Sequence, residues 1–155
     1  MAVNRGKQFE SVIRKAFEEI PEISIDRLHD QTTRFKGSQN ICDFIVYKEP
    51  YEYYFECKTV HGNTLPFTNI TDTQWNGLLA KTAIPGVYAG IICWWVDKGI
   101  TKFIPIRYLN WLKRTGHKSI RFDNTVGTII YGKKKRVFFE YDVMDFLERL
   151  QNGEY

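Results

Sequence analysis

The chain has 155 residues, of which 43% are hydrophobic and 26% are charged, and its formal net charge is +4. These values are ordinary for a globular protein, so we expect residues 1–155 to form a single domain. The mild positive charge favours a polyanionic partner without requiring one. No apolar stretch approaches membrane-spanning length and the first residues lack the apolar core of a signal peptide, which predicts a cytoplasmic protein that does not enter a membrane.

The N-terminal region is predicted to open with an amphipathic helix. Between Lys7 and Ile20 the apolar residues follow helical spacing, and Pro21 ends the segment. Glu10 and Arg14 lie one turn apart beside the apolar stripe, where they form an ion pair or face a cleft. The following polar segment is predicted to be mostly loop, with a short strand near Ser24–Arg27.

Two short apolar and aromatic segments, Ile41–Tyr47 and Glu52–Lys58, are predicted to form a β-hairpin. The antiparallel register places Asp43 directly opposite Glu56, with Lys58 on the same face as Glu56. Like charges that face each other across a ladder destabilise it. Such a pair is most readily kept where a divalent cation lies between the oxygens, so the hairpin predicts a metal-dependent site.

The rest of the chain predicts alternating helices and strands around this hairpin. Thr71 and Gln74 have capping-box spacing and begin a second helix, and the nearly continuous apolar segment Val87–Val96 is typical of a central strand. Further predictions are a strand at Ile100–Ile104, a helix at Pro105–Leu112, an irregular basic stretch at 116–127, strands at Thr128–Tyr131 and Val137–Tyr141 around a basic turn, and a helix at Asp142–Gln151. This order predicts an α/β sandwich with a central mixed sheet flanked by helices.

The hairpin residues suit phosphodiester hydrolysis, which needs charge neutralisation, a positioned hydroxide and help for the leaving oxygen. Asp43, Glu56 and the backbone carbonyl of Cys57 are predicted to hold Mg²⁺, with Mn²⁺ as a substitute ion. Lys58 would orient the attacking water or stabilise the developing charge. The alternative is that Glu56 and Lys58 are surface residues of an amphipathic edge strand.

Several other polar residues have two interpretations each. Glu10 is a further acid of the site or a solvated helix carboxylate. Gln74 contacts a phosphate or a metal-bound water, or only completes its capping box, and His61 contacts a phosphate or lies in a turn. The residues predicted to bind DNA are basic side chains before Asp43, in the first helix and in the basic turn: Arg5, Arg14, Arg34, Lys36, Lys133, Lys134, Lys135 and Arg136, with His61 as a further candidate.

The motifs Ile41-Cys42-Asp43-Phe44 and Phe55-Glu56-Cys57-Lys58 resemble those of the PD-(D/E)xK nuclease superfamily, with Cys42 in place of the proline. The surrounding sequence, with Asn4-Arg5-Gly6 before Glu10 and Thr32–Gly37 before the aspartate, is similar to the RecU-type Holliday junction resolvases of Gram-positive bacteria and their phages. The segment from Lys58 through Gly62–Phe67 to Gln74 extends this similarity, which covers the chain from about Asn4 to Trp95.

The resemblance implies a restriction-endonuclease-like fold and a homodimer that nicks opposed strands of a four-way DNA junction with Mg²⁺. It also implies a catalytic set of Asp43, Glu56, Lys58, Glu10 and Gln74, and a recombinase or branch-migration helicase as a partner. The segment Gly62–Ile70 would correspond to the stalk that protrudes in this family. A different nuclease of the same fold and a non-catalytic DNA-binding accessory protein of recombination remain the alternative functions.

Overall fold

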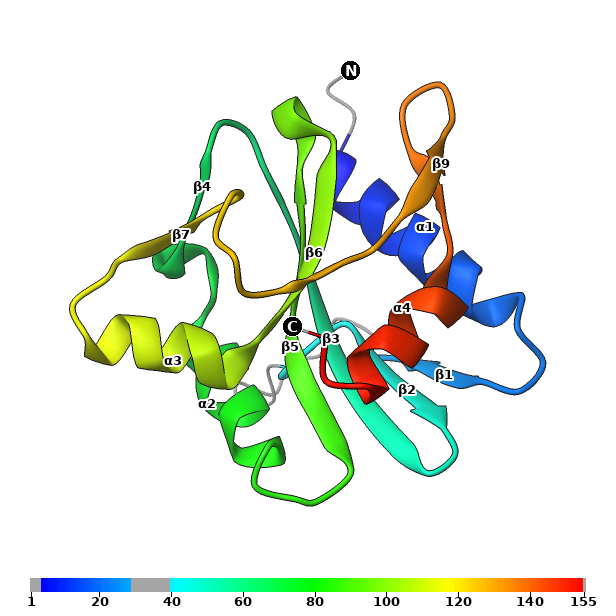
Figure 1. Cartoon of the computed structure of the whole chain (residues 1–155), viewed down its shortest axis with the longest axis horizontal. Helices are drawn as coiled ribbons and strands as arrows, with labels where there is room; N and C mark the ends of the chain where they lie inside the picture. Colours follow the sequence, from blue (N-terminus) through cyan, green and yellow to red (C-terminus); the bar gives the residue numbers. More distant parts are fainter. Residues whose placement is uncertain (1–3, 29–39, 155) are drawn as a thin grey trace, which may run out of the picture.

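The structure is a computed structural model that describes residues 4–28 and 40–154. Helices and strands alternate along the described chain (Figure 1). Their order is α1 (Arg5–Glu18), β1 (Ser24–Arg27), β2 (Phe44–Lys48), β3 (Tyr51–Val60), β4 (Thr64–Pro66), the 3₁₀-helix η1 (Phe67–Asn69), α2 (Asp72–Lys81), β5 (Val87–Trp95), the 3₁₀-helix η2 (Val96–Lys98), β6 (Ile100–Pro105), α3 (Ile106–Arg114), β7 (Ser119–Arg121), β8 (Thr128–Ile129), β9 (Gly132–Lys134), β10 (Phe139–Tyr141) and α4 (Val143–Gln151).

A six-stranded mixed sheet forms the centre of the molecule. Its strand order is β1-β2-β3-β5-β6-β8. β3 and β5 are parallel, and the other neighbouring strands are antiparallel. Because parallel strands need a crossover, the chain passes through β4 and α2 between them. The predicted mixed sheet is confirmed, and β3, which carries Glu56 and Lys58, lies in its interior.

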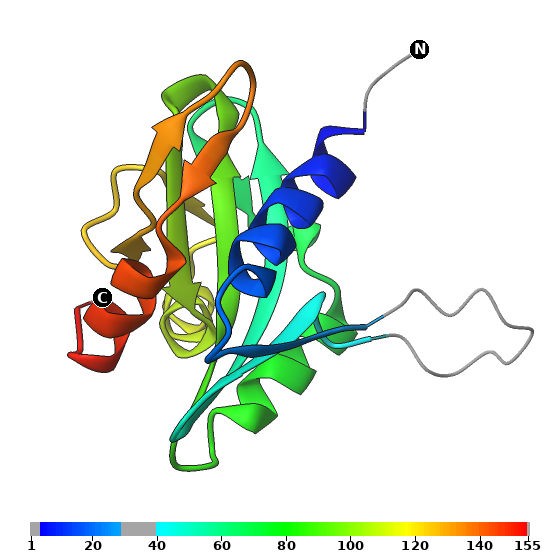
Figure 2. The same ribbon diagram turned by 90° about the vertical axis from the view of Figure 1, so that its right-hand side faces the viewer.

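Helices cover both faces of this sheet, as Figures 1 and 2 show. On one face, α1 and α4 contribute Phe9, Phe17 and Phe146 to a cluster with Phe55 of β3. On the other face, α2 and α3 pack against a second cluster in which Trp95 of β5 is fully buried. Apolar side chains alternate between these clusters along each strand because successive strand residues point to opposite faces. None of the described helices is long and apolar enough to span a membrane.

The helix boundaries follow local capping. Helix α1 begins at Arg5, two residues before the predicted start, because the side chain of Asn4 accepts a hydrogen bond from the Lys7 amide. Helix α2 begins after Thr71 with the predicted capping box, in which Thr71 and Gln74 exchange side-chain and backbone hydrogen bonds. Strand β1 confirms the short strand predicted before the hairpin.

The C-terminal third differs from the sequence prediction in its pairing. The predicted hairpin of 128–131 with 137–141 does not form, because β8 pairs with β6 and extends the main sheet. The separate ribbon contains β9 and β10 instead, so Lys133 and Lys134 lie in a strand rather than in a turn. The irregular stretch 116–127 also contains β7, which pairs with β4.

The segment Gly62–Ile70, predicted to correspond to a stalk, packs against the body of the protein. Leu65 is fully buried, and Phe67 and Ile70 are 6% and 5% exposed. Pairing of β4 with β7 fixes the segment further. The prediction of a protruding element is therefore wrong for this segment, because its apolar side chains complete the core under α2 and α3.

Candidate active site

The acidic hairpin has the predicted register. Phe44 lies opposite Phe55 in the β2–β3 ladder, and the same register continued by one residue places Asp43 opposite Glu56. The Asp43 amide donates a hydrogen bond to the Phe55 carbonyl at 3.0 Å, and the Cys57 amide donates to Asp43 Oδ2 at 2.7 Å. The aspartate therefore lies where β2 separates from β3, with its carboxylate beside the backbone of Cys57.

The hydrogen bond from Cys57 to Asp43 also indicates where the predicted carbonyl ligand, that of Cys57, points. The N–H and C=O of one strand residue point to the same edge of the strand. Because the Cys57 N–H reaches Asp43, the Cys57 carbonyl points to the same side, beyond Phe44, the first residue of β2. Cys57 is thus placed to offer a main-chain oxygen next to the two carboxylates.

Glu56, Lys58 and Gln74 form a closed set of contacts. Glu56 Oε1 accepts a hydrogen bond from Gln74 Nε2 at 2.8 Å and lies 3.0 Å from Lys58 Nζ. Lys58 Nζ also donates to Gln74 Oε1 at 3.3 Å. Glu56 is only 5% exposed, so it is not a solvated residue of an edge strand. The structure contradicts that alternative because β3 has neighbours on both sides.

The capping-box interpretation of Gln74 is confirmed, while its contact with a phosphate or a metal-bound water stays a prediction. Its Oε1 accepts a hydrogen bond from the Thr71 amide at 3.1 Å, which completes the capping box. Its Nε2 remains available and reaches Glu56. The start of α2 therefore positions an amide beside Glu56, and the same side chain couples helix formation to the geometry of the site.

Glu10 reaches the site from α1 but has an unexpected partner. Its Oε1 lies 3.2 Å from Nε of Arg27, the last residue of β1. The predicted i,i+4 pair with Arg14 does not form, because Arg14 lies 3.7 Å from Glu18 instead. Arg27 was not identified from the sequence, since only the antiparallel pairing of β1 with β2 brings it beside α1.

One open cavity of about 450 Å³ is lined by five predicted site residues: Glu10, Asp43, Glu56, Cys57 and Lys58. The other five lining residues, among them Lys7 and Asn69, were not predicted to belong to the site. Lys7 adds a cation on the first turn of α1, next to Glu10. The lining residues are Asn4, Gly6, Lys7, Glu10, Asp43, Glu56, Cys57, Lys58, Thr59 and Asn69. The cavity therefore combines three acids with two lysines at the end of β2 and β3.

Burial disfavours ionisation of the two central acids. Desolvation, followed by the charge of Glu56, raises the pKa of Asp43 to about 8, although the Cys57 amide opposes the shift. Desolvation also raises the pKa of Glu56, while the charge and hydrogen bond of Lys58 lower it. A cation between these oxygens would remove the repulsion and favour both charged forms.

The donor set suits Mg²⁺. Within residues 4–28 and 40–154, no group of three or more His, Cys, Asp or Glu side chains is arranged to hold a metal ion. Mg²⁺ is commonly held by one or two carboxylates together with water and substrate phosphate oxygens. Asp43, Glu56 and the carbonyl of Cys57 provide that smaller set.

The predicted DNA-binding residues are distributed unevenly around this site. Arg34 and Lys36 lie outside the described residues. His61 is in a turn, where its Nδ1 lies 3.2 Å from Asp97 Oδ1, and Asp97 also accepts a hydrogen bond from the Gly62 amide at 2.6 Å. His61 therefore lies in the connection between β3 and β4, as one interpretation predicted, and its contact with a phosphate stays a prediction.

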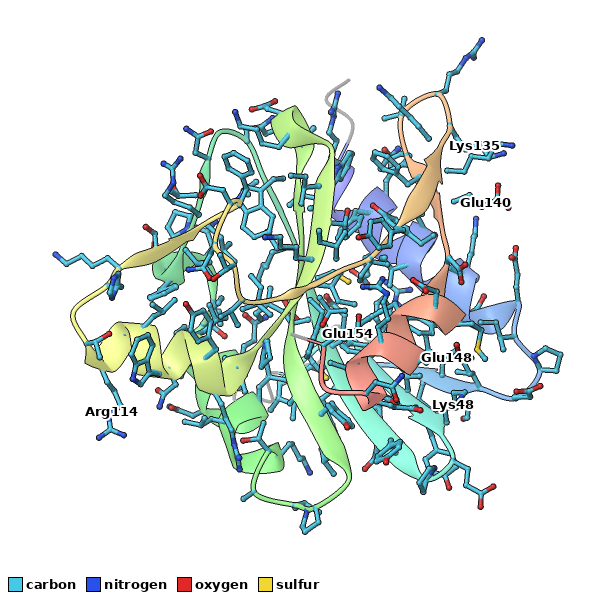
Figure 3. The ribbon with its side chains drawn as sticks, viewed as in Figure 1. Lys48, Arg114, Lys135, Glu140, Glu148 and Glu154 are labelled. Atoms are coloured by element: carbon cyan, nitrogen blue, oxygen red, sulfur yellow. The ribbon has the colours of Figure 1, made fainter. Side chains whose placement is uncertain are left out.

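The β9–β10 ribbon lies beside α1, as Figures 1 and 2 show, and its basic residues are exposed. Lys133, Lys134 and Arg136 are exposed. Lys135 lies 2.9 Å from Glu140 of β10, and Figure 3 labels this pair. Arg5 is exposed at the start of α1. The ribbon and the start of α1 thus present cations on the part of the molecule near the N-terminus.

Comparisons with known proteins support the fold. No protein-family model matches the chain, and no curated protein matches it. A solved structure that matches is the Holliday junction resolvase Hjc of the archaeal hyperthermophile Archaeoglobus fulgidus. The match has a TM-score of 0.54 at 17% sequence identity, and it covers 79% of this chain and 93% of Hjc. The chain therefore has the restriction-endonuclease-like α/β fold, as predicted.

Proposed function

We propose that this protein is a divalent-metal-dependent endonuclease that cuts branched DNA, with four-way junctions as its substrate. The observation that carries the proposal is the set of Asp43, Glu56, Lys58 and Gln74 at the end of the β2–β3 hairpin. Two facing carboxylates, of which Glu56 is buried and Asp43 is half-buried, destabilise a fold unless a cation neutralises them. The shared fold with a Holliday junction resolvase supports branched DNA as the substrate.

Each residue has a role in this proposal. Asp43, Glu56 and the Cys57 carbonyl hold Mg²⁺, which supplies charge neutralisation at the phosphate and an acidified water. Lys58 holds a proton-bearing amine 3.0 Å from Glu56, where it orients a water or stabilises negative charge on a phosphate oxygen. Gln74 keeps the Glu56 carboxylate and the Lys58 amine in this arrangement through its two hydrogen bonds.

The substrate contacts and assembly follow the same proposal. Arg5, Lys133, Lys134 and Arg136 bind phosphates without reading bases, since exposed lysines and arginines supply sequence-independent contacts. Two copies of the chain place two such sites on opposed strands, because a two-fold symmetric substrate matches a two-fold dimer. We propose a RecU-type resolvase that acts with a recombinase or a branch-migration helicase.

Cleavage of three labelled substrates tests this function. A four-way junction, a linear duplex and a single strand are incubated with protein in Mg²⁺ and in chelator. Symmetric nicks confined to the junction and dependent on Mg²⁺ are expected, and Asp43→Asn or Glu56→Gln abolishes them while junction binding persists. Asp26→Asn, which removes an exposed carboxylate from β1, is the matched control and keeps full activity.

The other outcomes identify the alternatives. Equal cutting of the linear duplex would indicate a different nuclease of this fold. Binding without cleavage at any divalent cation would indicate a non-catalytic accessory protein. Cleavage retained by both the Asp43 and Glu56 variants would remove the proposed metal site.

A further inference from the structure

A second basic surface lies on α3, outside the candidate active site. The 25 residues between Asp97 and Asp123 contain no acidic residue but include seven of the chain's 22 lysines and arginines. Helix α3 lies in the middle of this stretch and forms an outer edge of the molecule (Figure 1). The sequence predicts a basic stretch only after this helix, at 116–127, and the proposed chemistry does not use α3.

The packing of α3 decides which side chains face outward. Ile106, Leu109 and Leu112 are buried against the sheet. Trp111 and Arg114, three residues apart, are both exposed, and Figure 3 shows the Arg114 side chain pointing away from the body. Trp111 is 56% exposed, whereas the other three tryptophans of the chain are at most 4% exposed. A large indole is thus presented on a cationic helix face.

This indole is held in place by its own helix. The ring of Tyr108 stacks against it with centroids 5.8 Å apart and an interplanar angle of 19°. The neighbouring cations differ in availability. Arg107 donates hydrogen bonds to the side chain and carbonyl of Thr82, and the ammonium of Lys113 lies over another tryptophan ring. Arg114 has no acidic partner within the described ranges 4–28 and 40–154.

We infer that the α3 face, formed by Tyr108, Trp111 and Arg114, binds unpaired nucleotides of a DNA strand. Exposed aromatic rings stack on bases, while nearby cations bind the backbone phosphates, and such stacking needs bases that are not inside a duplex. Trp111 would stack on a base and Arg114 would contact a phosphate. The inference rests on the proposed function only in taking DNA as the partner.

The same residues argue against a second copy of the chain as the occupant of this face. A two-fold interface places the same patch of both subunits together and must be self-complementary. A face with Arg114 and no acid in the surrounding stretch would bring like charges together. Nucleic acid supplies the opposite charge that the face lacks.

Fluorescence tests the inference directly. Trp111 is the exposed tryptophan, so stacking of a base changes its emission while the buried indoles contribute a constant signal. The Asp43→Asn variant, which is not expected to cut, is titrated with oligothymidylate and with a linear duplex. Saturable quenching by the single strand is expected, and Trp111→Ala weakens single-strand binding about 5- to 150-fold. Trp111→Phe retains most of the affinity.

Two controls separate stacking from general charge and from misfolding. Tyr47→Ala removes an aromatic side chain that is 48% exposed on β2 and leaves binding unchanged. Arg114→Gln lowers the slope of log affinity against log salt by about 0.7, as expected for one single-strand phosphate contact. Unchanged thermal unfolding of Trp111→Ala shows that the exposed substitution leaves the fold intact.

The inference is overturned by three results. The first is single-strand binding that Trp111→Ala leaves unchanged. The second is the absence of quenching at saturating oligothymidylate. The third is tryptophan emission that changes with protein concentration but not with added DNA. The last result, with a dimer in sedimentation that Trp111→Ala dissociates, would assign the face to self-association. Failure of junction cleavage by the wild-type protein tests the active site and leaves the quenching result interpretable.

Discussion

Replacing Asp43 with asparagine is expected to make the metal-free protein more stable while it abolishes cleavage. The carboxylate is largely buried opposite Glu56, and its pKa is raised to about 8. In the native state Asp43 therefore holds its proton to a higher pH than in the unfolded chain. Between about pH 4 and pH 8 the native state binds more protons than the unfolded state, so stability falls as the pH rises.

The magnitude follows from this shift. Each pH unit between the ordinary aspartate value of 3.8 and pH 7 costs up to about 1.4 kcal/mol, or up to about 4 kcal/mol in all. Asparagine avoids this cost but accepts a weaker hydrogen bond from the Cys57 amide, which offsets about 1 kcal/mol. We expect a net gain of about 1–3 kcal/mol, which raises Tm by about 2–10 °C for a chain of this size.

Thermal unfolding in chelator at several pH values from about 5 to about 8 measures the effect. The wild type loses stability over this range, and Asp43→Asn shows a smaller slope. Saturating Mg²⁺ then raises the Tm of the wild type, because a ligand that binds only the native state stabilises it, and it barely changes that of the variant.

Asp26→Asn, at an exposed position of the neighbouring strand, is the control and changes stability by less than about 0.5 kcal/mol. An Asp43→Asn variant that is no more stable than the wild type in chelator, with the same pH slope, would refute the reasoning.

Two further predictions concern the residues around the acid pair. Arg27→Met removes the cation beside the helix acid, so the DNA-free protein should bind Mg²⁺ or Mn²⁺ roughly two- to fivefold more tightly by calorimetry. The control is Arg121→Met, which removes an exposed ion pair elsewhere and should not change the affinity for the metal ion. Unchanged or weaker metal binding in Arg27→Met would contradict the prediction. Gln74→Leu should lower stability by about 1–3 kcal/mol and slow cleavage, because it loses hydrogen bonds to both the Thr71 amide and Glu56. Thr71→Ala should lower stability alone, and equal cleavage rates in the two variants would show that Gln74 acts only as a cap.

The sequence was sufficient to predict the elements that depend on contacts between residues close together in the chain. The apolar and aromatic segments Ile41–Tyr47 and Glu52–Lys58 predicted the hairpin and its register, because a short connection between two strands leaves one antiparallel pairing. The same pattern placed Asp43 opposite Glu56 before any tertiary information. The capping box at Thr71 predicted the start of α2 for the same reason, since its partners are three residues apart.

The errors lie where pairing connects distant segments. Thr128–Ile129 adds to β6 rather than pairing with 137–141, and Thr64–Pro66 pairs with Ser119–Arg121. No periodicity in either segment identifies such a partner, because the choice depends on which edge of the sheet is open once the core has formed. The segment expected to protrude, Gly62–Ile70, instead covers that core.

Spacing along the chain was enough to predict two facing acids on the hairpin and a lysine on the same face. It was also enough to predict that Gln74 takes part in the capping box of α2. Only the tertiary structure decided that the amide of Gln74 lies 2.8 Å from Glu56 and that Arg27 neutralises Glu10. It also decided that Trp111 is exposed while three other tryptophans are buried. The physical reason is that spacing along a chain specifies contacts within an element, whereas contacts between elements depend on how their apolar faces pack together.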